Sequence, residues 1–329
     1  MSDRPPWRVA IIGAGRMGLT HTNAWHALDG RAIVVAASSR TPPRWVDDLR
    51  IRAVRDFYEA IDDPQVDIVD ICLPTRLHRE ATVRALAAGK HVMVEKPLAL
   101  SLADATAIVT AAAASSGQLM VAHVVRFMPG YQVVRSIIES QELGTPTHVS
   151  AARLKSGSEG IAWIRDVEQS GGVTVDLLVH DYDQANIVLG RPSTAYAKTV
   201  AGRAVSVVVE YEDGGVAVVD GSTAMPSGYV FSTLLRVSCT EGAVEYATGE
   251  LGAADVVRVW RADGSTQSLN VESAEPYTAQ ARYFVDQLDS GGAVAEGTPR
   301  DGYDATAVAI AALRATTTGA GEPVAWLDR

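Results

Sequence analysis

Short apolar runs alternate with longer helix-forming segments through the first third of the chain. Apolar runs of four to eight residues are typical of strands that are buried on both faces of a parallel sheet. The segments between them are long enough to cross over such a sheet as helices, so the pattern predicts a doubly wound α/β domain. Strands are expected at 9–12, 32–37, 53–54, 66–73, 91–95 and 119–122, and helices at 19–28, from 56, at 77–88 and at 101–115.

The pattern changes after His123, and from Ala195 onward the chain is rich in strands separated by glycine-containing turns. This arrangement predicts an α+β domain with a large open, mostly antiparallel sheet. We therefore expect a first domain at 1–124 and a second at 125–329. Strands are expected at 147–154, 199–200, 205–211, 216–222, 231–238, 243–246 and 256–260, and helices at 131–140, 173–189, 276–288 and 301–317.

The first strand leads into a glycine motif with the spacing G-x-G-x-x-G, which runs Gly13-Ala14-Gly15-Arg16-Met17-Gly18. The first glycine permits a tight turn, the second lets a pyrophosphate approach the backbone, and the third lets the next helix pack closely. The helix N-terminus then offers free N–H groups to phosphate. Because a strand precedes the motif and a helix and second strand follow, it predicts dinucleotide binding.

The second strand does not end in the acid that usually binds the ribose of NAD. The sequence there reads Ser38-Ser39-Arg40. Hydroxyl groups and a guanidinium suit a 2′-phosphate, so we expect NADP in preference to NAD. The alternative is that Arg40 is a solvated turn residue before two prolines.

Composition restricts the class of protein further. The 329 residues are 47% hydrophobic and 21% charged, with a formal net charge of -10, which argues against nucleic acid or an anionic membrane as partner. The two cysteines form no metal-binding or disulfide pattern, so no metal is expected. No apolar run approaches the ~20 residues of a membrane helix, and no leader is evident. We expect a cytoplasmic protein that acts on a small molecule.

Two further stretches carry candidate catalytic groups. The fifth strand ends in Glu95-Lys96-Pro97, and ligands of open α/β sheets bind beyond the carboxyl ends of strands. In the segment 173–189, Asp176 and His180 are spaced i, i+4 and should share one helix face. Histidine can transfer a proton near neutral pH. The alternatives are a surface lysine, and a helix-terminal acid beside a core histidine.

Several residues of the second half have the chemistry of a sugar-binding wall, namely hydroxyl-binding charges and an aromatic face. Lys155, Trp163 and Arg165 flank a polar loop, and Arg126 follows the sixth strand. The alternative for each of them is a structural role, which for Arg126 is a surface ion pair.

Three motifs together resemble the Gfo/Idh/MocA family: Leu73-Pro74-Thr75-Arg76-Leu77-His78, the stretch from Ala85 to Val92, and Glu95-Lys96-Pro97. This resemblance implies a Rossmann domain joined to an open-faced sheet domain, and NAD(P)-linked chemistry on polyols, sugars and related carbonyls. It also implies a homo-oligomer and a cis peptide bond between Lys96 and Pro97. A C-terminal helix at about 301–318 should pack back on the first domain.

The resemblance also implies site residues. Lys96, Asp176 and His180 would form the catalytic set and contact the substrate, and Tyr277 would face the active site. The cofactor would contact the glycine motif, Ser38–Arg40, and the family-motif positions Leu73, Pro74, Thr75, His78, Glu95 and Lys96. Two departures from the family pattern are the missing acid after the second strand and Thr75-Arg76 in place of Pro-Asn.

The expected reaction is reversible hydride transfer at a secondary alcohol or ketone of a polyol, cyclitol or sugar. Three alternatives remain open: an NADPH-dependent keto-sugar reductase, an NAD-dependent glycosidase of the same family, and a nucleotide-sensing protein without chemistry.

Overall fold

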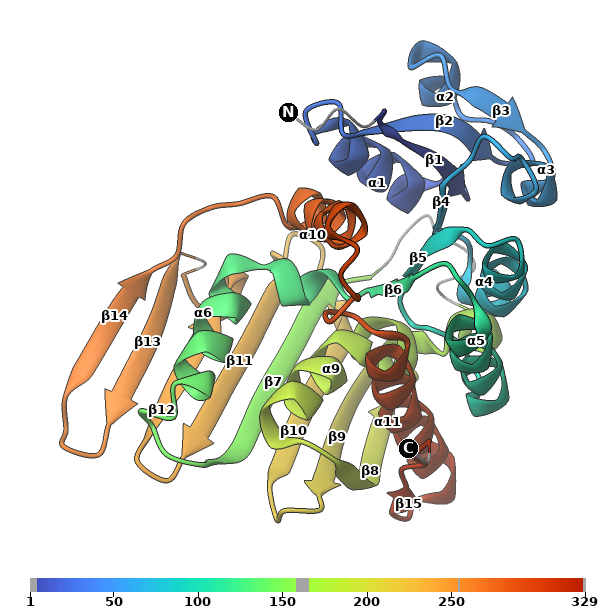
Figure 1. Cartoon of the computed structure of the whole chain (residues 1–329). Helices are drawn as coiled ribbons and strands as arrows, with labels where there is room; N and C mark the ends of the chain where they lie inside the picture. The colour runs from blue at the N-terminus through green and yellow to red at the C-terminus, as the bar shows by residue number, and fades with distance from the viewer. Residues whose placement is uncertain (1–4, 158–165, 254, 328–329) are drawn as a thin grey trace. The chain divides into compact units, whose positions relative to one another are not determined.

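Six parallel strands form the first sheet, in the order β3-β2-β1-β4-β5-β6 (Figure 1). The computed structural model describes residues 5–157, 166–253 and 255–327. The strand order is that of a dinucleotide-binding doubly wound sheet, as the alternating sequence pattern predicts. The strands are β1 (Trp7–Ile12), β2 (Ala32–Ser38), β3 (Arg52–Val54), β4 (Ile68–Ile71), β5 (His91–Glu95) and β6 (Leu119–Ala122).

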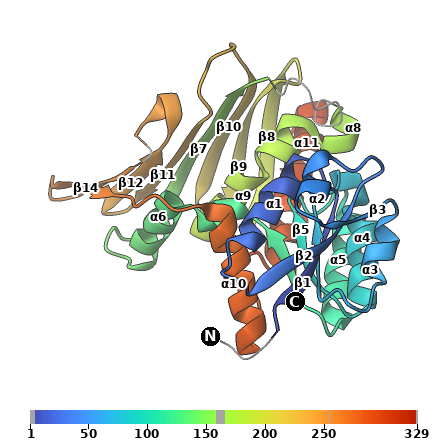
Figure 2. The same ribbon diagram turned by 90° about the horizontal axis from the view of Figure 1, so that it is seen from above.

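Helices lie on both sides of this sheet. Helix α1 packs against α10 on one side, and α3, α4 and α5 neighbour one another on the other (Figure 2). Helix α5 begins after Ser101, whose hydroxyl accepts the N–H of Asp104 at 3.1 Å and so caps the helix. The helical elements are α1 (Arg16–His26), α2 (Arg44–Asp48), α3 (Phe57–Ile61), η1 (Thr75–Leu77), α4 (His78–Ala87), α5 (Leu102–Ala114), η2 (Val124–Phe127) and α10 (Pro276–Ser290).

The hydrophobic core beside the first sheet is completed by α10, although this helix lies much later in the sequence. Phe284 of α10 is fully buried in the same cluster as Trp25 and Leu28. The indole Nε1 of Trp7 donates to Asp289 at 2.8 Å, which attaches the end of α10 to the start of β1.

Two compact units result. The first ends at Phe127 but takes in Glu275–Tyr303, and the second comprises Met128–Ala274 and the chain from Asp304. The sequence-based division assigned everything after 124 to the second domain. The structure instead gives α10 to the first unit, because its apolar face completes that unit's core.

The second unit contains a nine-stranded sheet in the order β14-β13-β12-β11-β7-β10-β9-β8-β15. Only β7 and β10 pair in parallel; the other described neighbours are antiparallel. This confirms the expected open, mostly antiparallel sheet. The strands are β7 (Pro146–Ser156), β8 (Pro192–Val200), β9 (Ala204–Tyr211), β10 (Val216–Met225), β11 (Ser232–Cys239), β12 (Gly242–Ala247), β13 (Val256–Arg261), β14 (Thr266–Asn270) and β15 (Glu322–Pro323).

Helices α6 and α9 pack on one face of this sheet (Figure 1). Strand β9 alternates accordingly, with Val205, Val207 and Val209 buried and the residues between them exposed. No helix of the described chain is long and apolar enough to cross a membrane. The helical elements are α6 (Pro129–Glu139), α8 (Val167–Ser170), η3 (Val173–Leu177), α9 (Val179–Leu189), η4 (Gly249–Leu251) and α11 (Pro299–Thr318), which begins in the first unit.

Candidate active site

The glycine turn between β1 and α1 has the shape of a phosphate cradle. Gly13 has φ +105°, and a Cβ there would lie 2.6 Å from the carbonyl oxygen of Cys72. A Cβ on Gly18 would lie 2.3 Å from the carbonyl oxygen of Gly13, whereas a Cβ on Gly15 would meet nothing within 4 Å. Helix α1 has no side-chain cap and no acid in its first turn. An anionic pyrophosphate therefore fits over Gly15 at the helix N-terminus.

The residues after β2 divide into two kinds. Ser38 is buried, and its carbonyl oxygen accepts the N–H groups of Gly13 and Ala14 at 3.2 and 2.9 Å. The Ser39 hydroxyl donates to the carbonyl of Thr41 at 2.8 Å. Arg40 is exposed and has no hydrogen bond or ion pair to any residue that the structure describes. Of the three predicted 2′-phosphate ligands, Arg40 is the one whose side chain is available.

The turn after β4 is held by a buried histidine. The ring of His78 lies with Nε2 2.9 Å from the carbonyl oxygen of Leu73 and Nδ1 2.9 Å from that of Pro97. Burial lowers the pKa of His78. His78 was expected to contact the cofactor. Its ring joins the turns after β4 and β5 through two backbone carbonyl oxygens, and its contact with a cofactor stays a prediction.

Lys96 stands at the carboxyl end of β5, on the same edge of the parallel sheet as the glycine turn. Its peptide bond to Pro97 is cis, as the family resemblance implies. The backbone N–H of Lys96 donates to Oε2 of the buried Glu95 at 3.0 Å. Glu95 thus supports Lys96 from inside the sheet.

Tyr277 and Arg126, both predicted to contact substrate, lie in the first unit. The Tyr277 ring is 5.8 Å from the ring of His21, and burial raises the pKa of its hydroxyl. Arg126 is buried and forms ion pairs with Glu296 at 3.2 Å and Asp301 at 3.1 Å. The ion pair named as the alternative for Arg126 is therefore present, although it is buried rather than on the surface.

The stretch that carries Asp176 and His180 is not the single helix that its pattern predicts. Residues Val173–Leu177 form a π-helical turn, and α9 starts only at Val179. A π-turn places more than four residues in each turn, so the i, i+4 geometry of a straight α-helix does not apply. Asp176 and His180 are both half-buried. Such π-turns are frequent at functional sites.

A cavity of about 750 Å³ lies within the second unit. It is lined by two of the predicted substrate residues, Lys155 and Asp176, and by Arg203, which the sequence did not single out. Apolar side chains such as Val173 and Leu177 complete the wall together with Ser156 and Thr223. A wall that combines apolar surface with a few charged and hydroxyl groups suits a hydroxylated ligand. Trp163 and Arg165, two further predicted substrate residues, lie outside the described residues.

A buried ion pair anchors the start of α9. The guanidinium of Arg153, on β7, binds both carboxylate oxygens of Asp181 at 2.8 and 3.0 Å. Their side chains are 3% and 1% exposed. Asp181 directly follows His180, so this pair holds His180 at the sheet. Both elements contain several polar residues, so no signal in the sequence singled out this pair.

Comparisons with known proteins agree with this geometry. The sequence model of an oxidoreductase family with an NAD-binding Rossmann fold, Gfo/Idh/MocA, matches residues 7–123. The model of the GFO/IDH/MocA C-terminal domain matches residues 131–245.

Curated relatives cover most of the chain. The chain is 30% identical over 268 residues to the uncharacterized oxidoreductase YrbE of Bacillus subtilis, which covers 75% of this chain and 77% of that protein. It is 27% identical over 327 residues to the inositol 2-dehydrogenase of Rhizobium meliloti, covering 93% and 96% of the two chains.

The fold is also that of solved dehydrogenases. A levoglucosan dehydrogenase in complex with NADH and L-sorbose superposes with a TM-score of 0.88 at 20% identity, covering 98% of this chain and 100% of that one. Together with the two matched domains and the relatives, this likeness confirms the resemblance read from the motifs: the chain belongs to the Gfo/Idh/MocA family of oxidoreductases.

Proposed function

We propose that this protein is a nicotinamide-dependent dehydrogenase that oxidises, reversibly, a secondary alcohol of a polyol, cyclitol or sugar. The observation that carries the proposal is Lys96 at the carboxyl edge of the parallel sheet, the edge that also holds the open glycine cradle. Named relatives that act on inositol or reduce 1,5-anhydro-D-fructose support the substrate class.

The proposed chemistry divides between three side chains. The bound nicotinamide supplies the hydride acceptor. His180 removes the proton of the substrate hydroxyl as the C–H electron pair leaves and the C=O bond forms. The Lys96 ammonium hydrogen-bonds the substrate oxygen and stabilises the negative charge that develops on it. Asp176, which lines the cavity of the second unit, binds a neighbouring hydroxyl or orients His180.

A variant of Lys96 tests this assignment. Lys96→Ala should lower kcat by about 10²–10³-fold, because a charge that stabilises the reacting oxygen is lost. The dissociation constant of the cofactor, followed by nicotinamide fluorescence, should stay within about threefold, since Gly13–Gly18 remain intact. Lys198→Ala, which removes an exposed lysine from β8, is the matched control. An active Lys96→Ala enzyme would remove Lys96 from the mechanism.

A second candidate, NADPH-linked reduction of a keto-sugar, is favoured by Arg40. This side chain is exposed and has no carboxylate partner in the described chain. We expect NADPH to bind more tightly than NADH. Arg40→Ala should reduce the ratio of the NADH and NADPH dissociation constants by at least about tenfold. Equal affinity of the unmodified protein for the two cofactors would show that Arg40 is a solvated turn residue.

We further propose a homo-oligomer that pairs the free faces of the nine-stranded sheet. Tyr196 and Val208 lie directly opposite each other on that face and are 42% and 37% exposed. Contiguous exposed apolar patches mark protein–protein interfaces, and this pair would form part of such a patch. Light scattering should give a mass above that of one chain, and Val208→Lys should reduce this mass.

Both cysteines are free, and on that ground we propose a cytoplasmic location.

A further inference from the structure

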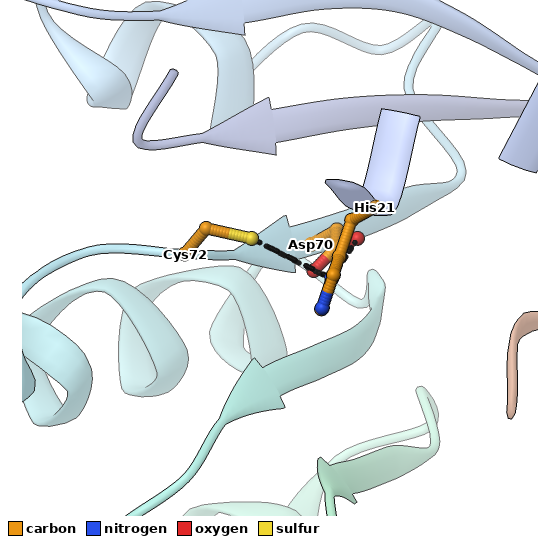
Figure 3. A group of neighbouring side chains, drawn as sticks. All are labelled: His21, Asp70 and Cys72. Atoms are coloured by element: carbon orange, nitrogen blue, oxygen red, sulfur yellow. Dashed lines mark hydrogen bonds and ion pairs between the residues drawn. The ribbon is translucent and has the colours of Figure 1, made fainter. Parts of the chain in front are cut away.

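His21 lies buried between two carboxylates. This residue of α1 is 2% exposed, and its Nδ1 is 2.9 and 3.0 Å from the two carboxylate oxygens of Asp70 on β4 (Figure 3). Its Nε2 is 3.1 Å from Oε1 of Glu95 on β5. One imidazole therefore joins the helix that follows the glycine cradle to two neighbouring strands.

The geometry requires a donor on each ring nitrogen, because carboxylates only accept hydrogen bonds. Burial alone would lower the pKa of His21, but the negative charge of Asp70 and its hydrogen bond to the ring raise it well above its usual value. Burial alone would raise the pKa of Glu95, but the hydrogen bond and the charge of His21 hold this pKa below its usual value. The network is thus an imidazolium between two carboxylates.

The same cluster has the composition of a small metal site, since ligand atoms of His21, Asp70 and Cys72 lie within 4.8 Å of one another (Figure 3). Both ring nitrogens already face carboxylate oxygens, however, and the indole of Trp25 donates to Asp70 at 2.7 Å. Burial also raises the pKa of the Cys72 thiol to about 12, so it is protonated at neutral pH. These contacts assign the cluster to hydrogen bonding rather than to a metal.

Glu95 connects His21 to the backbone of Lys96. Oε1 of Glu95 faces His21, and Oε2 accepts the backbone N–H of Lys96. Without the bond from His21, the Glu95 carboxylate would be buried with one oxygen unpaired, and it would turn or take up a proton. Either change alters the acceptor that fixes the backbone of Lys96.

We propose that His21 is a positioning residue for Lys96, and that it acts through the carboxylate of Glu95. The inference rests on the proposed function, in which Lys96 contacts the reacting oxygen. It adds that one buried side chain, His21, fixes the position of the catalytic lysine relative to the cofactor-binding helix α1.

Amide hydrogen exchange of Lys96, measured by NMR, tests the link without any substrate. His21→Gln should speed exchange of the Lys96 amide at least about tenfold, since a hydrogen bond to a charged acceptor is weakened. Trp25→Phe is the matched control, because it removes another donor to Asp70 from the same core but leaves Glu95 and Lys96 in place. Exchange that is unchanged in His21→Gln, or equally fast in Trp25→Phe, would overturn the inference.

Kinetics provide the second readout. His21→Gln should lower kcat about 10–100-fold, as expected for a misplaced catalytic group, with the cofactor dissociation constant nearly unchanged. Trp25→Phe should keep kcat within about twofold. Should His21→Gln not fold, Glu95→Gln breaks the same link from the other side and carries the same expectation. Full activity of His21→Gln beside an inactive Lys96→Ala refutes the inference alone, whereas an active Lys96→Ala refutes the proposed function.

Discussion

The buried pair of Arg153 and Asp181 permits a quantitative prediction for the second unit. Both side chains are almost fully buried and bind each other through two hydrogen bonds. Removing one partner leaves an isolated charge in the interior, which typically costs about 3–5 kcal/mol. For a domain of this size that corresponds to a loss of about 6–20 °C in melting temperature.

A double-mutant cycle separates the energy of the ion pair from the packing contribution of the two side chains. Arg153→Met and Asp181→Leu should each destabilise the unit by this amount. The double variant should be no less stable than either single one, because no charge remains buried and unpaired. Thermal unfolding followed by calorimetry measures all three, and Arg258→Met, which removes a 51% exposed partner of Glu245, is the control.

The reasoning fails if the single variants lose less than about 1 kcal/mol, the range of exposed ion pairs. It also fails if the two losses add in the double variant, since independent sites behave in that way. Such results would mean that water reaches the pair and that α9 is held by other contacts.

Two further predictions concern the first unit. The pKa of His21 is raised in the folded state, so the stabilising contribution of His21 is complete below about pH 6.5 and is lost as the pH rises through the folded pKa. The pKa of Glu95 is lowered in the folded state, so the contribution of Glu95 is present above about pH 4.5 and is lost on acidification. The difference in melting temperature between the wild type and His21→Gln should therefore be largest between these values and shrink at alkaline pH, and a constant difference would show that His21 is neutral. Gly15→Ala should weaken cofactor binding without changing stability, because the added Cβ would occupy open space at the cradle. Gly18→Ala should lower both cofactor affinity and stability, because its Cβ would meet the carbonyl oxygen of Gly13. Isothermal titration measures the affinities and thermal unfolding the stabilities, and equal losses of stability in the two variants would contradict the geometry.

The strands of the first sheet could be predicted from sequence because most of their residues are apolar and helix-forming segments separate them. Both β5 and β6 have the bounds expected of them, since glycines interrupt the chain before each. Strand β14 was not predicted, because its residues are mostly exposed and give no hydrophobic period. The π-turn at Asp176 was read as α-helix, because apolar spacing does not distinguish the two over five residues.

The sequence was sufficient to propose candidate site residues, but not to predict the contacts that surround them. The family motifs indicate Lys96 and His78, whereas the two carbonyls that His78 joins depend on the turns of two strands. The role of His21 was not inferred, although Asp70 gives a signal as a charged residue inside an apolar strand. That signal shows that a partner exists without showing which residue it is.

The contribution of α10 to the first unit has a consequence for biosynthesis. A ribosome releases the six parallel strands early, yet the helix that covers Trp25 and Leu28 is made only after the whole nine-stranded sheet. The nascent N-terminal region must therefore persist with an apolar surface uncovered while the second unit is translated, a state that is prone to aggregation. The unit whose synthesis starts first is completed only when the chain returns to it.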